Sequence, residues 1–167
     1  MTETQTRYQL NIDVRPTGVE SAYVAAPFDE AKEALESKGY IVISIQENAK
    51  LRMSQRNESS VSRSGNWTRE GSLYVPNKGK FLTKKSPIMS NAREATEAHR
   101  REKDFYLNEE QVEEALSDSV EIKSGDYQIN IPINRFGSDD LTVFMFGDAR
   151  TAQEYGDFLR NVDIQGM

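Results

Sequence analysis

His99 is the only histidine of the chain and the first residue to consider for acid–base chemistry. Imidazole ordinarily exchanges a proton near neutral pH, so a histidine beside a carboxylate can act as a general acid or base. His99 follows Ala95 by one turn of a predicted helix and lies on its apolar stripe. We therefore predict a half-buried structural histidine. A small enzyme that uses His99 is the third of three functional hypotheses.

Metal and thiol chemistry are restricted by the composition. The 167 residues include no cysteine, which excludes disulfides, thiolate nucleophiles and cysteine-bound zinc or iron–sulfur centres. Oxygen ligands for magnesium or calcium remain, because Glu109, Glu110, Glu113 and Glu114 form two acidic pairs four residues apart. Acids near the start of a helix are also favourable without a metal. We expect no metal and no cofactor.

Nucleotide-binding and hydrolase motifs are absent from the sequence. Lys78-Gly79-Lys80 has neither the long glycine loop nor the following Ser or Thr of a phosphate-binding loop. This absence favours a non-enzymatic protein with no catalytic residues. The first residues are polar, without a signal-peptide pattern, and no apolar run is long enough to span a bilayer. We therefore expect a cytoplasmic protein that does not contact a membrane.

The charge of the chain is distributed unevenly. Residues 50–103 hold thirteen of the 21 Lys and Arg residues but only five acids, which gives this segment a net charge of +8. The whole chain has a net charge of −6, so the remaining residues sum to −14. Such a contrast within one chain indicates a surface that faces a polyanion.

Aromatic residues lie among these bases, namely Trp67, Tyr74 and Phe81. Bases of single-stranded nucleic acid stack on aromatic rings, while Lys and Arg bind the phosphates. The first hypothesis is therefore a small binding protein whose 50–103 surface contacts a polyanion, with single-stranded nucleic acid as the preferred class. The predicted contact residues are Arg52, Arg63, Trp67, Arg69, Tyr74, Lys78, Lys80, Lys84, Lys85, Arg93 and Arg100.

A protein partner explains the same charges. The negative total charge weakens long-range attraction to a polyanion, and the aromatic rings could point into the core. The basic segment could pair with the acidic helix predicted at 108–116, or with an acidic surface on another protein. The second hypothesis is therefore a protein-interaction subunit, with the partner a second copy in a homo-oligomer as one form.

The helices and strands predicted from the sequence, which must position the candidate contact residues, indicate a single α+β domain over residues 1–167. Residues 8–14 alternate apolar and polar side chains, as a half-buried strand does, and a helix is predicted from Pro27 to Gly39. Residues 40–45 are apolar on both faces and predict a central strand. Residues 51–82 predict a β-meander with a hairpin turn between Val75 and Phe81.

The second half of the chain is expected to be rich in helices. Ser86-Pro87 predicts a helix start, and Asn108 with Gln111 predicts a capping box for the acidic helix. Residues 120–133 predict a hairpin, residues 141–146 a central strand, and residues after Asp148 a final helix. Together, the predicted elements indicate a mixed or antiparallel sheet of about five to seven strands with about four helices.

Overall fold

The strands form two separate antiparallel sheets in the structure, a computed structural model that describes residues 8–14, 20–56, 63, 65–123 and 130–165. Strands β1 (Asn11–Val14) and β2 (Glu20–Tyr23) make a two-stranded ribbon. Strands β3 (Gly71–Val75), β4 (Gly79–Thr83) and β5 (Ser119–Glu121) make a three-stranded sheet in that order. The predicted α+β class is confirmed, but the prediction of one sheet with five to seven strands is wrong.

Helices predominate over strands in the described part of the chain, where seven α-helices and one short 3-10 helix are present. The prediction of about four helices is too low. The helices are α1 (Phe28–Glu36), α2 (Ile45–Gln55), α4 (Pro87–Ser90), α5 (Ala92–Arg100), α6 (Glu109–Leu116), α7 (Asp140–Phe146), α8 (Ala149–Gln165) and the 3-10 turn η1 (Ile133–Arg135). None of the described helices has the length and apolar character needed to cross a membrane.

The central strand predicted at 40–45 is wrong, because this segment is a loop that leads into α2. Ser44 caps the helix: its hydroxyl accepts from the backbone N–H of Glu47 at 3.0 Å, and the Glu47 carboxylate accepts from the Ser44 N–H at 2.8 Å. This capping box satisfies two backbone donors and begins the helix at Ile45. Ile41 is 69% exposed. Residues 51–55, expected in the β-meander, are the end of α2.

The strand predicted at 141–146 is also wrong, because these residues form α7. The Asp139 carboxylate accepts from the backbone N–H groups of Leu141 and Thr142, which caps the helix start. Gly147 ends the helix with a φ of 89°, a left-handed conformation that glycine adopts without strain. In the hairpin predicted at 120–133, the turn at 124–126 lies outside the described residues, and Ile133 begins the 3-10 turn.

Helices α2, α7 and α8 enclose the main core. Its buried members are Ala49, Phe146, Ala152 and Tyr155, and half-buried apolar side chains including Phe158 pack around them. The rings of Phe146 and Tyr155 are 4.9 Å apart between centroids. The predicted C-terminal helix therefore docks on the core, with Phe146 at the centre and Phe158 at the margin.

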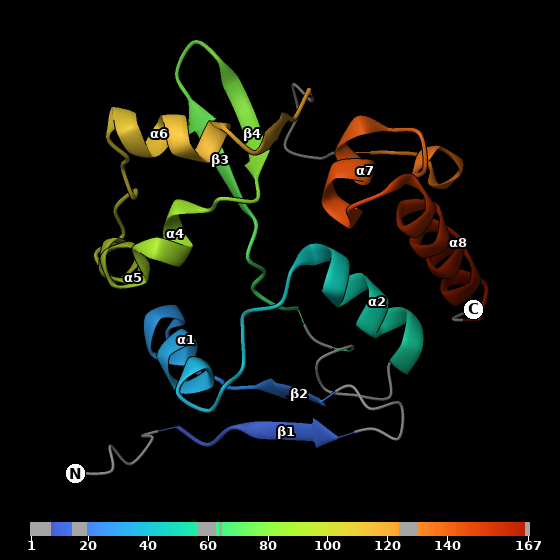
Figure 1. Ribbon diagram of the computed structural model, residues 1–167, viewed down its shortest axis with the longest axis horizontal. Helices are drawn as coiled ribbons and strands as arrows, with labels where there is room; N and C mark the ends of the chain where they lie inside the picture. The colour runs from blue at the N-terminus through green and yellow to red at the C-terminus, as the bar shows by residue number, and fades with distance from the viewer. Residues whose placement is uncertain (1–7, 15–19, 57–62, 64, 124–129, 166–167) are drawn as a thin grey trace.

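The three-stranded sheet projects away from this core, with α6 against one side and α7 near the other (Figure 1). Thr83 anchors it. Its hydroxyl is fully buried, donates to the carbonyl oxygen of Ala115 at 2.5 Å and accepts from the N–H of Lys85 at 3.0 Å. The base of the β3–β4 hairpin is therefore fixed to the end of α6, while the turn of the hairpin extends outward.

Candidate functional site

The exposed face of the β3–β4 hairpin carries an aromatic residue opposite a lysine. Tyr74 on β3 is the direct cross-strand partner of Lys80 on β4, so their side chains stand on the same face of the sheet. Tyr74 is 68% exposed, and Lys80 is exposed. Lys78 is exposed in the turn between the strands. Tyr74, Lys78 and Lys80 are called the hairpin face below.

The hairpin turn itself agrees with the prediction from the sequence. Asn77 has a φ of 65° and Gly79 a φ of 121°, which are conformations that Asn and Gly tolerate best. Val75 pairs with Gly79, and the carbonyl oxygen of Val75 accepts from the N–H of Lys78 at 3.0 Å. The predicted hairpin between Val75 and Phe81 is therefore confirmed.

Trp67 is exposed but lies apart from the hairpin face. Its side chain is 69% exposed, and its ring lies 5.1 Å from the ring of Phe28 at the start of α1. Six residues lie between Trp67 and Tyr74, and an extended chain from one to the other spans at most about 25 Å. Phe81, the third interleaved aromatic residue, is half-buried within β4. Trp67 and Tyr74 are thus the two accessible rings among the three.

Among the described residues, ion pairs join three of the predicted basic residues to acids of the same chain. Arg69 lies 2.9 Å from Glu47, and Lys85 lies 2.8 Å from Glu114 on the acidic helix. Arg100 lies 3.0 Å from the carboxylate of Glu30. Exposed pairs of this kind contribute only about 0.2–1 kcal/mol each. They nevertheless show that part of the basic charge faces neighbouring acids of the protein.

The remaining predicted residues come from several elements. Lys84 follows β4, and its ammonium stands 4.5 Å from the centre of the Phe144 ring, in cation–π contact. Arg52 is half-buried on α2, Arg63 is exposed, and Arg93 is exposed on α5. Helix α2 and the hairpin lie in different parts of the molecule (Figure 1). The eleven predicted contact residues therefore do not form one continuous patch.

His99 is exposed, so the prediction of a half-buried histidine is wrong. Helix α5 buries Thr96 against α1, and it ends at Arg100, one residue after His99. The side of α5 that packs against α1 is therefore centred on Thr96, and not on the line of residues from Ala95 to His99. His99 lines neither of the two clefts beside α5. The enzyme hypothesis gains no support from its position.

The acidic residues of α6 are not arranged as a metal site. Among the described residues, no group of three or more His, Cys, Asp or Glu side chains lies close enough to hold a metal ion. Glu109 and Glu110 lie in the first turn of α6, where the helix dipole favours them. The capping box of Asn108 and Gln111 predicted for this helix is confirmed.

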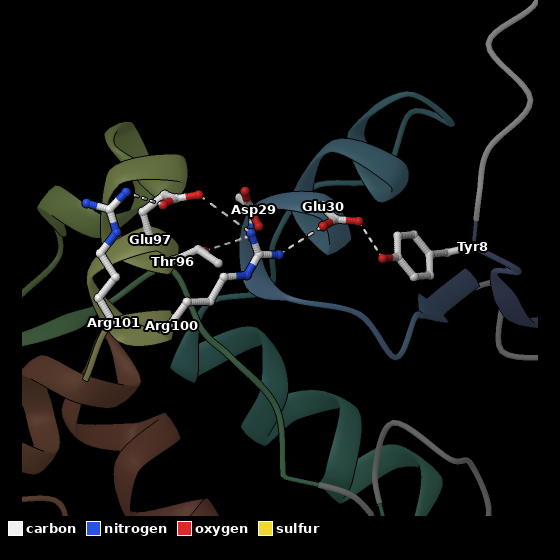
Figure 2. Close-up of polar contacts among 7 residues, drawn as sticks. All are labelled: Tyr8, Asp29, Glu30, Thr96, Glu97, Arg100 and Arg101. Atoms are coloured by element: carbon white, nitrogen blue, oxygen red, sulfur yellow. Dashed lines mark hydrogen bonds and ion pairs between the residues drawn. The ribbon is translucent and has the colours of Figure 1, made fainter. Parts of the chain in front are cut away.

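A polar cleft between α1 and α5 was not predicted from the sequence. Its volume is about 830 Å³, and its lining includes Asp29, Glu30, Arg93, Glu97 and Arg100. Figure 2 shows a chain of contacts along it, in which Arg100 joins Glu30 of α1 to Glu97 of its own helix. Glu30 in turn accepts from the hydroxyl of Tyr8 and Glu97 pairs with Arg101 at 3.3 Å.

The sequence gives only a partial signal for this cleft. Glu97 and Arg101 are four residues apart, a spacing that places them together on a helix. Arg100 and Glu30 are 70 residues apart, and nothing in either local sequence specifies their pairing. The cleft is created by the packing of α1 on α5, where the backbone N–H of Asp29 donates to the hydroxyl of Thr96 at 3.3 Å.

Glu47 makes folding stability dependent on pH in the acidic range. Partial burial raises its pKa, but hydrogen bonds from Ser44 and the charge of Arg69 outweigh that effect and hold the pKa below its ordinary value of 4.5. A lowered pKa in the folded state stabilises the protein above the unfolded-state pKa, and this contribution disappears as pH falls through the folded-state pKa.

Glu47→Gln is therefore expected to flatten the decrease in stability below about pH 4.5 and to lower stability at pH 7 by less than about 1 kcal/mol, because the pair with Arg69 is exposed. Urea denaturation at a series of pH values measures both effects. Glu113→Gln, an exposed acid of α6, is the control. Identical pH profiles for Glu47→Gln and the wild type would contradict the role assigned to Glu47.

Comparison with protein-family models, with curated proteins and with solved structures found no match to this chain. A functional assignment therefore depends on the geometry and charge of the surfaces described above.

Proposed function

We propose that this protein is a non-enzymatic binding protein that contacts a polyanion through its hairpin face, and that the polyanion is single-stranded nucleic acid. The observation that carries the proposal is the pairing of Tyr74 with Lys80 across the β3–β4 hairpin, with Lys78 exposed in the adjoining turn. An accessible ring beside two ammonium groups offers a stacking surface and phosphate contacts at one place.

The arrangement of the sheet supports this choice of surface. Glu121 on β5 is the cross-strand partner of Phe81, so the register places it on the face opposite to Tyr74 and Lys80. Because Tyr74 has most of its ring in solvent, a base could cover it without any rearrangement of the core.

A single strand fits the hairpin face better than a duplex does. In a duplex the base faces are stacked on each other, and a tyrosine ring can stack only on a base that has left the stack. A single strand presents its base faces and its phosphates together. Lysines at the turn and on β4 then bind the backbone on either side of the stacked base.

The role of the other predicted residues changes in this proposal. Arg69, Lys85 and Arg100 already contact acids of the same chain, so they add less to polyanion binding than their charge suggests. Trp67 supplies a second ring, separated from Tyr74 along the chain, that a longer strand could reach. The hairpin face is the centre of the proposed site.

The second candidate is a protein partner with an acidic surface, including a second copy of this chain. The contacts of Arg69 with Glu47 and of Lys85 with Glu114 favour it, because they show basic residues of this segment bound to carboxylates. The same lysines and tyrosine could bind exposed carboxylates of another chain.

Fluorescence anisotropy separates these two candidates. The probes are a labelled single strand of about 12 nucleotides, within the site sizes usual for such proteins, a duplex of equal length and a labelled polyglutamate. We expect the single strand to bind at low salt with a Kd well below about 1 mM, and more tightly than the other two. Binding of polyglutamate alone, or dimerisation seen by light scattering without nucleic-acid binding, would support the second candidate instead.

A further inference from the structure

Strand β3 forms an open edge of the three-stranded sheet. The order of the sheet is β3-β4-β5, so β3 pairs with β4 on one side only. Among the described elements, β4 is also the only one that packs extensively against β3. An unpaired edge presents a row of backbone N–H and C=O groups, which is a template for pairing with a strand of another chain.

The hydrogen bonds of β4 show which backbone groups of β3 point away from the sheet. The carbonyl oxygen of Lys80 accepts from the N–H of Ile122 at 2.8 Å, so the backbone of Lys80 faces β5. Backbone direction alternates along a strand, so the next residue of β4 faces β3 and bonds with its cross-strand partner Leu73. The backbone groups of Ser72 and Tyr74 therefore point outward. Within the described part of the chain, no hydrogen bond reaches them.

The open edge of β3 lacks the charges that normally protect an edge strand. Edge strands of soluble proteins usually carry charged residues or proline, which oppose pairing with another chain. Strand β3, Gly71–Val75, has neither. Each of the other described edge strands carries an acid, namely Asp13 in β1, Glu20 in β2 and Glu121 in β5. Among the described strands, β3 is thus the unprotected edge.

We propose that β3 pairs antiparallel with β3 of a second copy of this chain, about a two-fold axis at Leu73, so that the two sheets become one. In this register Ser72 of each copy lies opposite Tyr74 of the other. Both are outward-facing residues, so each such pair exchanges two backbone hydrogen bonds. Because Leu73 is the middle residue of β3, this register overlaps the whole of both strands, and any shifted register overlaps less.

The charges around β3 favour a second copy as the occupant. The strand is neutral from Gly71 to Val75, so no like charges meet along the pair. Glu70 precedes β3, and the antiparallel register brings it level with the hairpin turn of the other copy, where the charged residue is Lys78. The charges at each end of the pair therefore have opposite signs, and such complementarity helps to fix the register of an interface.

The second copy also contributes residues to the hairpin face. Residues directly opposite each other in an antiparallel pair lie on the same face of the sheet. The two-fold pairing therefore places Tyr74 and Lys80 of both copies on one continuous face. A single strand of sufficient length can then contact both rings. This consequence rests on the proposed function, whereas the dimer itself does not.

Sedimentation equilibrium of the full chain without nucleic acid tests the dimer. We expect a monomer–dimer equilibrium with a Kd below about 0.5 mM, since an interface of one short strand pair is small. Ser72→Pro removes an outward N–H from each copy, a change that an edge strand tolerates because the N–H faces solvent in the monomer. The loss of two hydrogen bonds is expected to weaken dimerisation by about tenfold or more.

Glu121→Pro is the matched control on the opposite edge of the sheet. Its cross-strand partner on β4 faces β3, so the N–H of Glu121 also points away from the sheet. This variant is expected to dimerise as the wild type does.

A single introduced cysteine tests the register, because the chain has no cysteine of its own. At the two-fold axis Leu73 forms a non-hydrogen-bonded pair with its copy, with Cα atoms about 4.5 Å apart, which a disulfide can bridge. Leu73→Cys is therefore expected to give a disulfide-linked dimer on a non-reducing gel after mild oxidation. Val75→Cys is expected to give little, because the two Val75 residues lie about 13 Å apart along the strands.

The cysteine variants keep the test decisive if circular dichroism shows that Ser72→Pro does not fold. The proposal is overturned if the wild type stays monomeric at about 1 mM protein. It is also overturned if a folded Ser72→Pro dimerises as tightly as Glu121→Pro, or if Val75→Cys cross-links as well as Leu73→Cys. A monomer that still binds oligonucleotide would overturn the dimer alone, and a dimer that binds none would overturn the proposed function alone.

Discussion

Phe146→Ala is expected to lower the free energy of unfolding by about 3–5 kcal/mol, the usual loss when a buried phenylalanine is truncated. Phe146 is 5% exposed and closes α7 onto α2 and α8. Its ring lies 4.9 Å from the ring of Tyr155 and 6.2 Å from that of Phe136, so the substitution leaves a cavity at the centre of the core. Urea denaturation followed by circular dichroism measures the loss.

Phe144→Ala is the matched control, since Phe144 lies on the same short helix but is only half-buried beside Lys84. Its expected cost is about 1–2 kcal/mol, within the ordinary range for a partly buried residue. A loss below about 1 kcal/mol for Phe146→Ala, or a larger loss for Phe144→Ala, would show that α7 does not pack on the core as described.

Tyr74→Ala is expected to weaken binding of a single-stranded oligonucleotide by about 1–3 kcal/mol at every salt concentration, because the stacking of a base on the ring does not depend on counterions. Tyr74 projects from the sheet into solvent, so its loss should leave the stability of the fold within about 0.5 kcal/mol of the wild type. Fluorescence anisotropy at several salt concentrations measures the change in affinity.

Tyr106→Ala provides the control for exposed aromatic area. Tyr106 is 81% exposed and its hydroxyl donates to the carboxylate of Asp104 at 3.3 Å, which makes its surroundings unfavourable for a phosphate. Its substitution is expected to leave affinity unchanged. Equal losses for Tyr74→Ala and Tyr106→Ala would indicate nonspecific binding to exposed rings and would count against the hairpin face.

The sequence correctly predicted a turn and a helix start that are each specified by a few neighbouring residues. The turn at Asn77 and Gly79 and the capping box of Asn108 with Gln111 are confirmed, because each is specified within a few residues. Short apolar runs were less informative. Residues 40–45 and 141–146 both resemble buried strands, and periodicity alone cannot separate a buried strand from a short buried helix. The caps at Ser44 and Asp139 were the overlooked signals.

The candidate site was predictable only in part for a similar reason. The sequence indicated that Tyr74 and the nearby lysines occur together, and the hairpin places Tyr74 opposite Lys80. It could not indicate which bases already pair with acids, because Arg69 pairs with an acid 22 residues away and Arg100 with one 70 residues away. Such pairings depend on tertiary packing, and so does the cleft between α1 and α5.

The salt dependence of oligonucleotide binding tests the central claim most directly. Each phosphate that a lysine neutralises releases condensed counterions, so the slope of log K against log salt is about −0.7 per contact for a single strand. Contacts from the two lysines of the hairpin face predict a slope of about −1.4 for the wild type. Replacing Lys78 and Lys80 together with Ala is expected to reduce its magnitude by about 1.4. Lys85→Ala is expected to change it little, because Lys85 already pairs with Glu114. A slope near zero, or a slope that the loss of Lys78 and Lys80 does not change, would contradict polyanion binding at the hairpin face.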